Sequence, residues 1–513
     1  MATNPQFLRH VRSDLRMPRV LTTAGVALVV CFVIFEAHSQ FLGARYSDPR
    51  LALQPHAKRS IDDTLFYWFI WGQAIVLPLW SLLSCIQSIA GERQMKTYDF
   101  VRTTRMTSWE LLIGYLFGAP ILAFAAMGTT AIVSFFIGLV EGIPVTAITA
   151  SYAILFAFTI FVSLLGLLVS LLVDRARVAG LVFVVLVGAV MFSVLSYASA
   201  GSPFPGLIAL GITPGLTNLY ESRDAGTVPF FGAQVPTLLV SFVLYLSLSA
   251  WVALAVWRNL KKDREEVRLF SNLQAVCFSV YANVFLLGFV SPNTATQFSV
   301  SFSTENATIV FLAVNLMIFY AVGLATLTPA ERLKIWYRGV RDVIHRTGPM
   351  FSNDTLFLPW VVVAALITCA GYATLVFLLR EIAPADDWLI QRVLVSILIL
   401  FLFAVRDLLF IQWLLLTRLR NTLPKAVGIV TLYYICMFLI SNFWNSPPSA
   451  ELPLALSAFT PASAFDRNVI GDAQVGGMMF QSLLICVLLT LIFRRLSRSP
   501  LDSQLLAVSN SRA

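Results

Sequence analysis

Long apolar runs separated by short polar segments dominate this chain, and each run approaches the ~20 residues that a helix needs to cross a bilayer. In the first half the predicted spans are Val20–Phe35, Thr64–Ala90, Trp109–Val140, Ile148–Val173, Val178–Tyr197 and Val235–Trp257. In the second half they are Leu273–Val290, Ala307–Leu327, Thr355–Leu379, Leu389–Leu416, Ala426–Ile440 and Met478–Phe493. Because a backbone in hydrocarbon has to satisfy its own polar groups, these runs predict an all-α polytopic membrane protein with about 12 transmembrane helices.

The composition excludes a water-soluble globule. The 513 residues are 58% hydrophobic and only 12% charged, whereas soluble domains carry about 25% charge. The six cysteines all lie inside apolar runs, which is typical of small hydrophobic side chains rather than of disulfide partners. The N-terminus is basic and amphipathic, so we expect no cleavable signal peptide.

Lysine and arginine concentrate in the segments on one predicted side of the membrane. The positive-inside rule then predicts that both termini are cytoplasmic and that the segment following Ala90 faces the cytoplasm. The net charge of +9 reflects this bias, so it indicates membrane lipids with anionic headgroups as partners and gives no reason to expect nucleic acid.

The two halves of the chain echo each other. Four pairs of segments recur in the same order, such as "ITPGLTNLYES" from Ile212 with "FTPASAFDRNV" from Phe459, and "GAQV" from Gly232 with "DAQV" from Asp472. Matched segments have the same rank and predicted membrane side, which predicts two parallel six-helix repeats, residues 1–262 and 263–513. Thr213–Pro214 and Thr460–Pro461 predict either re-entrant loops or ordinary external turns.

One cytoplasmic strip, "GERQMKTYDFVRTTRMTSWELLIG" from Gly91 to Gly114, is far more polar than its surroundings. Its pattern predicts a short surface helix. Phe100 and Val101 would anchor in a groove of a partner, with Glu92, Arg93 and Asp99 as the polar rim. The alternative is a solvated loop whose charges only obey the positive-inside rule.

This strip resembles the loop between the second and third spans of ABC-2-type permeases, the membrane subunits of ATP-driven exporters. The family pattern is filled in register by Glu92, Arg93, Thr97, Asp99, Val101, Thr104, Met106, Thr107, Glu110 and Gly114. The sequence departs from the pattern at Gln94, Lys96, Arg105 and Tyr115. The stretch Asn4–Arg19 is similar to that family's amphipathic entry helix, with Phe7, Leu8, Val11 and Leu15 on one face.

The resemblance implies that the loop carries a coupling helix that contacts ATP-binding cassette ATPase subunits supplied in trans, which would bind the ATP. The second half holds a divergent copy, "AERLKIWYRGVR" from Ala330, in which Glu331, Arg332, Tyr337, Val340 and Arg341 are kept. Arg338 replaces Asp99 there, which predicts a weaker or different partner contact.

We find no enzyme active site in the sequence. The chain has no Gly-Lys dipeptide, and therefore no phosphate-binding P-loop. No histidine is followed by glutamate, so the zinc-protease helix motif is excluded. We expect no catalytic residue, no metal and no cofactor in this chain.

Arg406 and Asp407 lie inside the tenth predicted span, where charges are costly. They predict either a substrate-pathway or gating element, or a structural ion pair. Adjacent helical residues point about 100° apart, so each is expected to pair with another group rather than with its neighbour. Ser163 and Leu164 occupy the matching positions in the first half.

The resemblance further implies that the second and fifth spans of each half line the transport path. In the second span its polar or aromatic members are Trp71, Gln73, Trp80 and Gln87. Nearly uncharged walls favour an amphipathic or lipid-like cargo. In the third span, Gly114 and Gly118 form a GxxxG pattern that predicts close helix packing, within the chain or between two copies.

These observations together predict a fused permease of the bacterial inner membrane that exports its cargo when separate ATPase subunits hydrolyse ATP. One alternative is a non-transporting, ATPase-linked membrane anchor that exerts force on an envelope machine through accessory envelope proteins. The other is a secondary transporter driven by an ion gradient, for which Asp407 is the carboxylate that could couple ions.

Overall fold

The structure is a computed structural model of the chain. It describes residues 4–46, 65–172, 227–231, 233–262, 270–288, 304–328, 330, 332–334, 336–337, 356–379, 387–417, 425–426, 428–430, 432–434, 436 and 472–497. The chain divides into two compact units, unit 1 (Met1–Val267) and unit 2 (Arg268–Ala513).

Unit 1 is built from helices with one small hairpin. Its elements are α1 (Pro5–Asp14), α2 (Met17–Tyr46), α4 (Leu65–Gln94), α5 (Tyr98–Thr103), α6 (Ser108–Gly118), α7 (Ile121–Val140), α8 (Val145–Leu172), β1 (Thr227–Phe230), β2 (Ala233–Pro236) and α12 (Thr237–Asn259). The strands β1 and β2 pair antiparallel, with Thr227 opposite Pro236 and Phe230 opposite Ala233.

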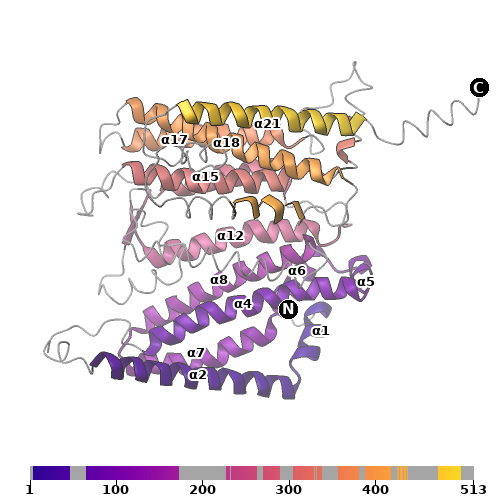
Figure 1. Cartoon of the computed structure of the whole chain (residues 1–513). Helices are drawn as coiled ribbons and strands as arrows, with labels where there is room; N and C mark the ends of the chain where they lie inside the picture. The colour runs from indigo at the N-terminus through magenta and orange to yellow at the C-terminus, as the bar shows by residue number, and fades with distance from the viewer. Residues whose placement is uncertain are drawn as a thin grey trace, which may run out of the picture. The chain divides into compact units, whose positions relative to one another are not determined.

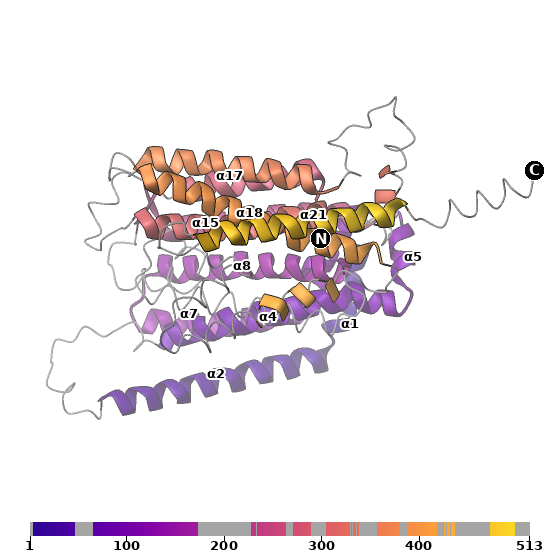
Figure 2. The same cartoon turned by 45° about the horizontal axis from the view of Figure 1, so that its top comes forward.

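Unit 2 contains five long helices among its described residues. They are α13 (Asn272–Gly288), α15 (Thr304–Thr326), α17 (Leu358–Leu379), α18 (Asp387–Leu415) and α21 (Asp472–Ser497). Shorter helical stretches are described between residues 330 and 337 and between residues 425 and 436. In Figures 1 and 2, α15, α17, α18 and α21 run side by side.

The structure confirms an α-helical, multi-pass membrane protein. Within the described residues, eight helices are long and apolar enough to cross a bilayer: α2, α4, α7, α8, α12, α17, α18 and α21. The helix α13 and the described core of α15, Val314–Thr326, are apolar but shorter. The predicted span Val178–Tyr197 lies outside the described residues, as do Thr213–Pro214 and Thr460–Pro461.

Two predicted elements are wrong in detail. The predicted span Trp109–Val140 is two helices, α6 and α7, because Pro120 cannot continue the backbone hydrogen bonding of α6. The predicted span from Val235 begins only at Thr237, after β2, so the chain includes a hairpin that an all-α prediction does not contain.

The helices of the two units have the same neighbours. In unit 1, α8 packs between α4 and α12, and α2, α4 and α7 contact one another. In unit 2, α18 packs on α15 and α21, and α13, α15 and α17 contact one another. Each unit therefore has one central helix, α8 or α18, which packs against helices on either side.

One end of unit 1 carries two short helices outside the set of long ones. Both α1 and α5 lie at this end, where α4, α6, α8 and α12 meet (Figures 1 and 2). A buried apolar cluster joins α4, α5, α6, α8 and α12 there: its members include Ile89, Tyr98, Val101, Leu111, Tyr115, Leu171, Val256 and Leu260. The polar strip predicted from the sequence is thus built into the packed end of unit 1.

Candidate functional site

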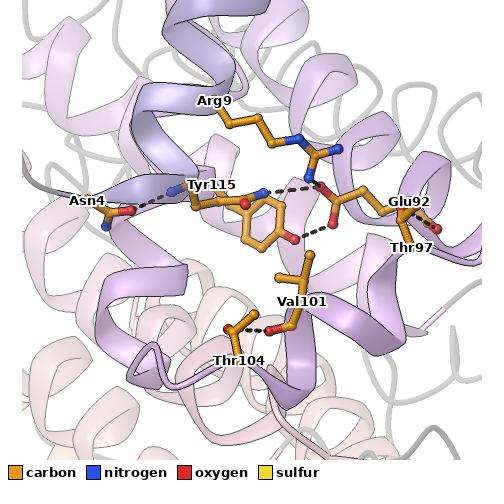
Figure 3. Close-up of polar contacts among 8 residues, drawn as sticks. Asn4, Arg9, Glu92, Thr97, Val101, Thr104 and Tyr115 are labelled. Carbon is orange, nitrogen blue, oxygen red and sulfur yellow. Dashed lines mark hydrogen bonds and ion pairs between the residues drawn. The ribbon is translucent and has the colours of Figure 1, made fainter.

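A buried carboxylate lies at the centre of this end. Glu92, in the last turn of α4, is only 4% exposed. Its Oε1 accepts from Arg9 Nη1 at 2.8 Å and from Gln6 Nε2 at 3.1 Å, both on α1. Its Oε2 accepts a short hydrogen bond from the Tyr115 hydroxyl of α6, and Figure 3 shows Arg9 and Tyr115 pointing at the carboxylate. We call Gln6, Arg9, Glu92 and Tyr115 the Glu92 cluster.

The cluster joins three helices through charge-assisted hydrogen bonds, which are about twice as strong as neutral ones. A buried carboxylate without partners would cost several kcal/mol in lost hydration. The partners of Glu92 come from two other helices, so the carboxylate is fully satisfied only when α1 and α6 are both in place.

The small residues of α6 let α1 approach closely. A Cβ at Gly114 would lie 2.9 Å from the Gln6 Cβ, and one at Gly118 would lie 3.0 Å from His10. Asn4 caps α1 by accepting from the backbone N–H groups of Gln6 and Phe7, and its Nδ2 donates to the Glu110 carbonyl at 2.6 Å. The GxxxG pattern therefore serves packing within the chain, with α1 as its partner.

Two side chains connect the start of α5 to the ends of long helices. Arg93 Nη1 donates to the carbonyl of Leu171 at 2.9 Å, at the end of α8, and the guanidinium stacks over the Tyr98 ring. The Tyr98 hydroxyl donates to the carbonyl of Leu260 at 2.8 Å, the C-cap of α12. Burial raises the pKa of Tyr98, although the nearby Arg93 lowers it in part. These contacts tie α5 directly to the ends of α8 and α12.

Tight turns on each side set the direction of α5. Lys96 has a positive φ of 58°, which is uncommon for a residue other than glycine. Thr97 follows and its backbone N–H donates to the Glu92 carbonyl at 2.9 Å. At the other end, the Thr104 hydroxyl donates to the Val101 carbonyl at 2.6 Å. One turn thus separates α5 from the end of α4, and a second turn separates it from the start of α6.

The helix α6 begins with a capping box. Thr107 Oγ1 accepts from the Glu110 backbone N–H, and the Thr107 backbone N–H donates to Glu110 Oε2 at 2.6 Å. These hydrogen bonds from Thr107 lower the pKa of Glu110. Glu110 is exposed, so its main structural role is to start α6 at this residue.

The outer surface of α5 and of the turn before it combines apolar and charged side chains. Phe100 is 74% exposed and Met95 is 65% exposed. Lys96 and Asp99 are exposed beside them, and Asp99 forms a long ion pair of 3.7 Å with Arg102. We call Met95, Lys96, Asp99 and Phe100 the α5 tip. A large exposed aromatic residue ringed by charges is typical of a surface that meets another protein.

The structure divides the predicted contact residues into two groups. Phe100 and Asp99 lie on the α5 tip, where a second molecule can reach them. Val101 is 5% exposed and packs inside unit 1, so the prediction that it anchors in a partner is wrong. Glu92 is likewise buried within unit 1, and it does not form a polar rim.

The remaining predicted residues of the strip serve the fold first. Arg93, in the last turn of α4, is half-buried against the end of α8. Met106 packs against the same apolar cluster as Val101. Thr97 and Thr104 hold the two turns, and Glu110 caps α6. Most residues that match the permease pattern therefore form turns, caps and packing contacts within unit 1.

The divergent copy in unit 2 is only partly described. Glu331 and Arg341 lie outside the described residues, as does Arg338. Arg332 and Tyr337 are half-buried on a helical stretch, and the Tyr337 ring lies 6.0 Å from that of Phe493 on α21. Tyr337 thus contacts the last described helix of its unit, as Tyr98 does in unit 1.

The charged pair in α18 belongs to a buried hydrogen-bond network. Asp407 Oδ2 accepts from the hydroxyls of Tyr320 on α15 and of Tyr434, each at 2.5 Å. Arg406 Nη1 donates to Gln481 Oε1 on α21 at 3.0 Å. We call Tyr320, Arg406, Asp407, Tyr434 and Gln481 the Arg406 network.

Contrary to the prediction, Arg406 and Asp407 also pair with each other. Arg406 Nη2 lies 2.6 Å from Asp407 Oδ1, and Nε lies 2.8 Å from the same oxygen. The arginine side chain is long enough for its guanidinium to reach the carboxylate of Asp407, although the two Cβ atoms point in different directions. Its guanidinium also lies 4.8 Å from the ring centre of Phe403 and 5.3 Å from that of Tyr433. The pair fits a structural junction between α15, α18 and α21.

The residues expected to line a transport path all lie on α4, but they differ in exposure. Gln73 is buried, and its Nε2 donates to Ser134 of α7 and Tyr152 of α8 at 3.4 and 3.3 Å. Trp71 is half-buried and donates to the Tyr67 hydroxyl at 2.7 Å. Gln87 is exposed. Gln73 therefore stabilises packing within unit 1, and Gln87 is the member of the set that faces outward.

Sequence reasoning missed most of the Glu92 cluster. Gln6 and Arg9 lie on the polar face of the entry helix, whereas the family resemblance rests on its apolar face. Tyr115 departs from the family pattern, yet its hydroxyl donates a hydrogen bond to Glu92. The signal that could have found them was the pair Gly114 and Gly118, which marks where a helix comes close.

Comparison with known proteins adds no relative. No protein-family model matches the chain, and no curated protein matches it at a significant level. Among the described residues, no group of three or more His, Cys, Asp or Glu side chains could hold a metal ion. The described site is a set of hydrogen bonds that join the ends of several helices, next to the exposed α5 tip.

Proposed function

We propose that this chain is the membrane subunit of an ATP-driven exporter, as its resemblance to ABC-2-type permeases implies, and that a separate ATPase binds the α5 tip. The observation that carries the proposal is the contrast across α5. Phe100 on its outer side is 74% exposed, whereas Tyr98 and Val101 on its inner side are each 5% exposed. A helix held so firmly on one side and bare on the other is suited to receive force from a partner.

The contacts behind α5 supply a route for that force. A push on the tip reaches α12 through the Tyr98 hydroxyl and α8 through Arg93. It reaches α1 and α6 through Glu92, which precedes the turn. ATP-dependent closure of the partner would thus tilt several long helices together.

The neighbour order of the helices supports two fused halves. The order of contacts around α8 in unit 1 is repeated around α18 in unit 2. Together with the recurring sequence segments, this supports two parallel six-helix repeats and about twelve spans. A weaker contact of the ATPase with the region of Arg332 and Tyr337 would make the complex asymmetric.

The cargo, on this proposal, is amphipathic or lipid-like, and the protein resides in a bacterial inner membrane with both termini in the cytoplasm. Ion coupling has less support. Asp407, which a secondary transporter would use, already accepts hydrogen bonds from Arg406, Tyr320 and Tyr434.

The test is co-purification of an ATPase with the full chain from native membranes. Phe100→Asp places a charge on the tip without touching the buried side, and it should reduce the retained ATPase by more than ten-fold, as expected for a hot-spot residue. Val140→Asp is the matched control, because Val140 is 89% exposed at the far end of α7.

Equal ATPase retention by the two variants would overturn the α5 tip as the docking site. Cargo flux by the purified chain alone, driven by an ion gradient and independent of ATP, would overturn the exporter assignment. ATPase retention without any flux of candidate lipids in proteoliposomes would favour the membrane anchor.

A further inference from the structure

The side of α1 that packs against α6 is polar rather than apolar. Its protein-facing side carries the polar residues Gln6 and His10, which pack against Gly114 and Gly118 of α6. The apolar residues Leu8 and Val11 are half-buried, and Leu15 is 37% exposed. The apolar stripe of this amphipathic helix is therefore only partly covered by unit 1, and its exposed end is Leu15.

Basic side chains flank that stripe where α1 meets α2. Arg12, Arg16 and Arg19 are all exposed. Within the part of the chain that the structure describes, the guanidinium groups of Arg12 and Arg16 have no hydrogen-bond or ion-pair partner. We call Arg12, Leu15, Arg16, Met17 and Arg19 the α1–α2 corner.

The corner lies at the end of a membrane span. The span in α2 begins at Met17, and few of its residues are buried inside unit 1. Met17 is 76% exposed and Leu21 is 68% exposed. A span that begins here places the arginines at the level of the lipid headgroups, where charged side chains at helix ends extend toward the interface.

We propose that the α1–α2 corner binds an anionic phospholipid. The guanidinium groups of Arg12 and Arg16 hold the phosphate, with Arg19 beside them, because guanidinium matches phosphate in charge and geometry. The acyl chains lie along the exposed apolar side of α2 and under Leu15. A lipid fits this surface better than a soluble anion because the charges adjoin an apolar stripe.

The lipid would also stabilise the candidate site. The helix that carries Arg12 also carries Gln6 and Arg9, which hydrogen-bond to Glu92. A headgroup bound at the corner fixes the far end of α1 and so favours the position in which both residues reach Glu92. This step needs no ATPase, and it is independent of the proposed exporter function.

The experiment measures lipid binding to the full chain by thermal unfolding in detergent. The added probes are phosphatidylglycerol, phosphatidylcholine and inorganic phosphate. Phosphatidylglycerol should raise the melting temperature of the wild type, and the other two should not. The double variant R12Q/R16Q should weaken the apparent affinity for phosphatidylglycerol by about ten- to thirty-fold, given the typical contribution of each basic residue at a membrane surface.

The matched control is R105Q/K261Q, which removes the same charge from two exposed residues of unit 1 away from the corner. It should bind phosphatidylglycerol as the wild type does. Normal melting of R12Q/R16Q in phosphatidylcholine shows that the variant is folded. An equal loss in both double variants, or an equal response to inorganic phosphate, would overturn the lipid site.

Discussion

Units 1 and 2 join equivalent helices by different chemistry. In unit 1 the polar contacts between α4 and α8 include a hydroxyl pair, Ser81 and Ser163, with 2.5 Å between the oxygens. The single proton of Ser163 is donated to the Thr159 carbonyl at 2.6 Å, so Ser81 must be the donor in the pair. In unit 2 the Arg406 network joins α15 with α18, and the sequence alignment of the two halves predicts that Ser163 occupies the position matching Arg406.

The two polar contacts restrict their helices to different degrees. A pair of serine hydroxyls contributes about 1 kcal/mol and lets the helices shift against each other. A buried ion pair with several hydrogen bonds allows few arrangements, because each partner that moves leaves a charge unsatisfied. The hydroxyl pair of unit 1, which carries the α5 tip, is therefore the less restrictive of these two polar contacts.

The largest effect is expected from Asp407→Ala, which leaves Arg406 buried without its carboxylate. The free energy of unfolding should fall by roughly 3–5 kcal/mol, measured by denaturant titration of the detergent-solubilised chain. Ser163→Ala at the matching position should cost only about 1 kcal/mol. Similar losses in the two variants would contradict the comparison between the units.

A double variant sharpens the same comparison. Replacing both charges, in R406M/D407L, removes the ion pair without leaving an unpaired charge, so stability should be close to that of the wild type. The Arg406 network would then act by restricting the arrangement of unit 2. A loss as large as that of Asp407→Ala would show that the hydrogen bonds themselves stabilise the unit.

The next effect concerns the Glu92 cluster of unit 1. Glu92→Ala removes the acceptor of three hydrogen bonds and should cost about 3 kcal/mol, since bonds to charged groups are the strong ones. Released α1 should become sensitive to trypsin at Arg9 and Arg12. Asp99→Ala is the control, because its side chain is 78% exposed, and it should change stability by less than about 0.5 kcal/mol.

Close packing in unit 1 gives a smaller effect. A Cβ at Gly166 of α8 would lie 2.8 Å from the backbone carbonyl of Leu82 on α4. Gly166→Ala should therefore push the two helices apart and cost about 2 kcal/mol. At Gly25 of α2 a Cβ meets no atom within 4 Å, so Gly25→Ala should stabilise slightly, as it does in open helices. Equal melting temperatures of the two variants would argue against tight α4–α8 packing.

The smallest effect is at the start of α6. Thr107→Ala removes an N-cap and should cost about 1 kcal/mol near neutral pH. Because the pKa of Glu110 is lower in the folded chain, its contribution is present above the unfolded value of ~4.3 and is lost as the pH falls through the folded value. The difference between wild type and variant should therefore shrink in acid, and a constant difference from pH 7 to pH 3 would contradict this.

The long spans could be predicted from the sequence because lipid imposes one requirement on every residue of a helix. The helices α4, α8, α12 and α18 each overlap a predicted span. The break between α6 and α7 could have been predicted as well, since Pro120 interrupts a run much longer than a bilayer requires. The hairpin of β1 and β2 gave no such signal, because its strands are only four residues each.

The site was harder to predict because its key contacts join distant parts of the chain. The sequence indicated that Glu92 and Val101 matter, but it could not show that both are buried. Burial of a short amphipathic helix depends on which neighbours are present, and these neighbours are the ends of α8 and α12. Phe100 and Val101 have similar hydropathy, yet only packing decides that one faces out and the other faces in.

The long sequence separation between α1 and its seat on α6 has a consequence for biosynthesis. Asn4 bonds to the Glu110 carbonyl across 106 residues, so α1 leaves the ribosome well before the glycines that receive it. Until Gly114 and Gly118 emerge, α1 cannot take up the position in which it packs on α6. The full set of hydrogen bonds to Glu92 therefore forms only after α6 has been synthesised.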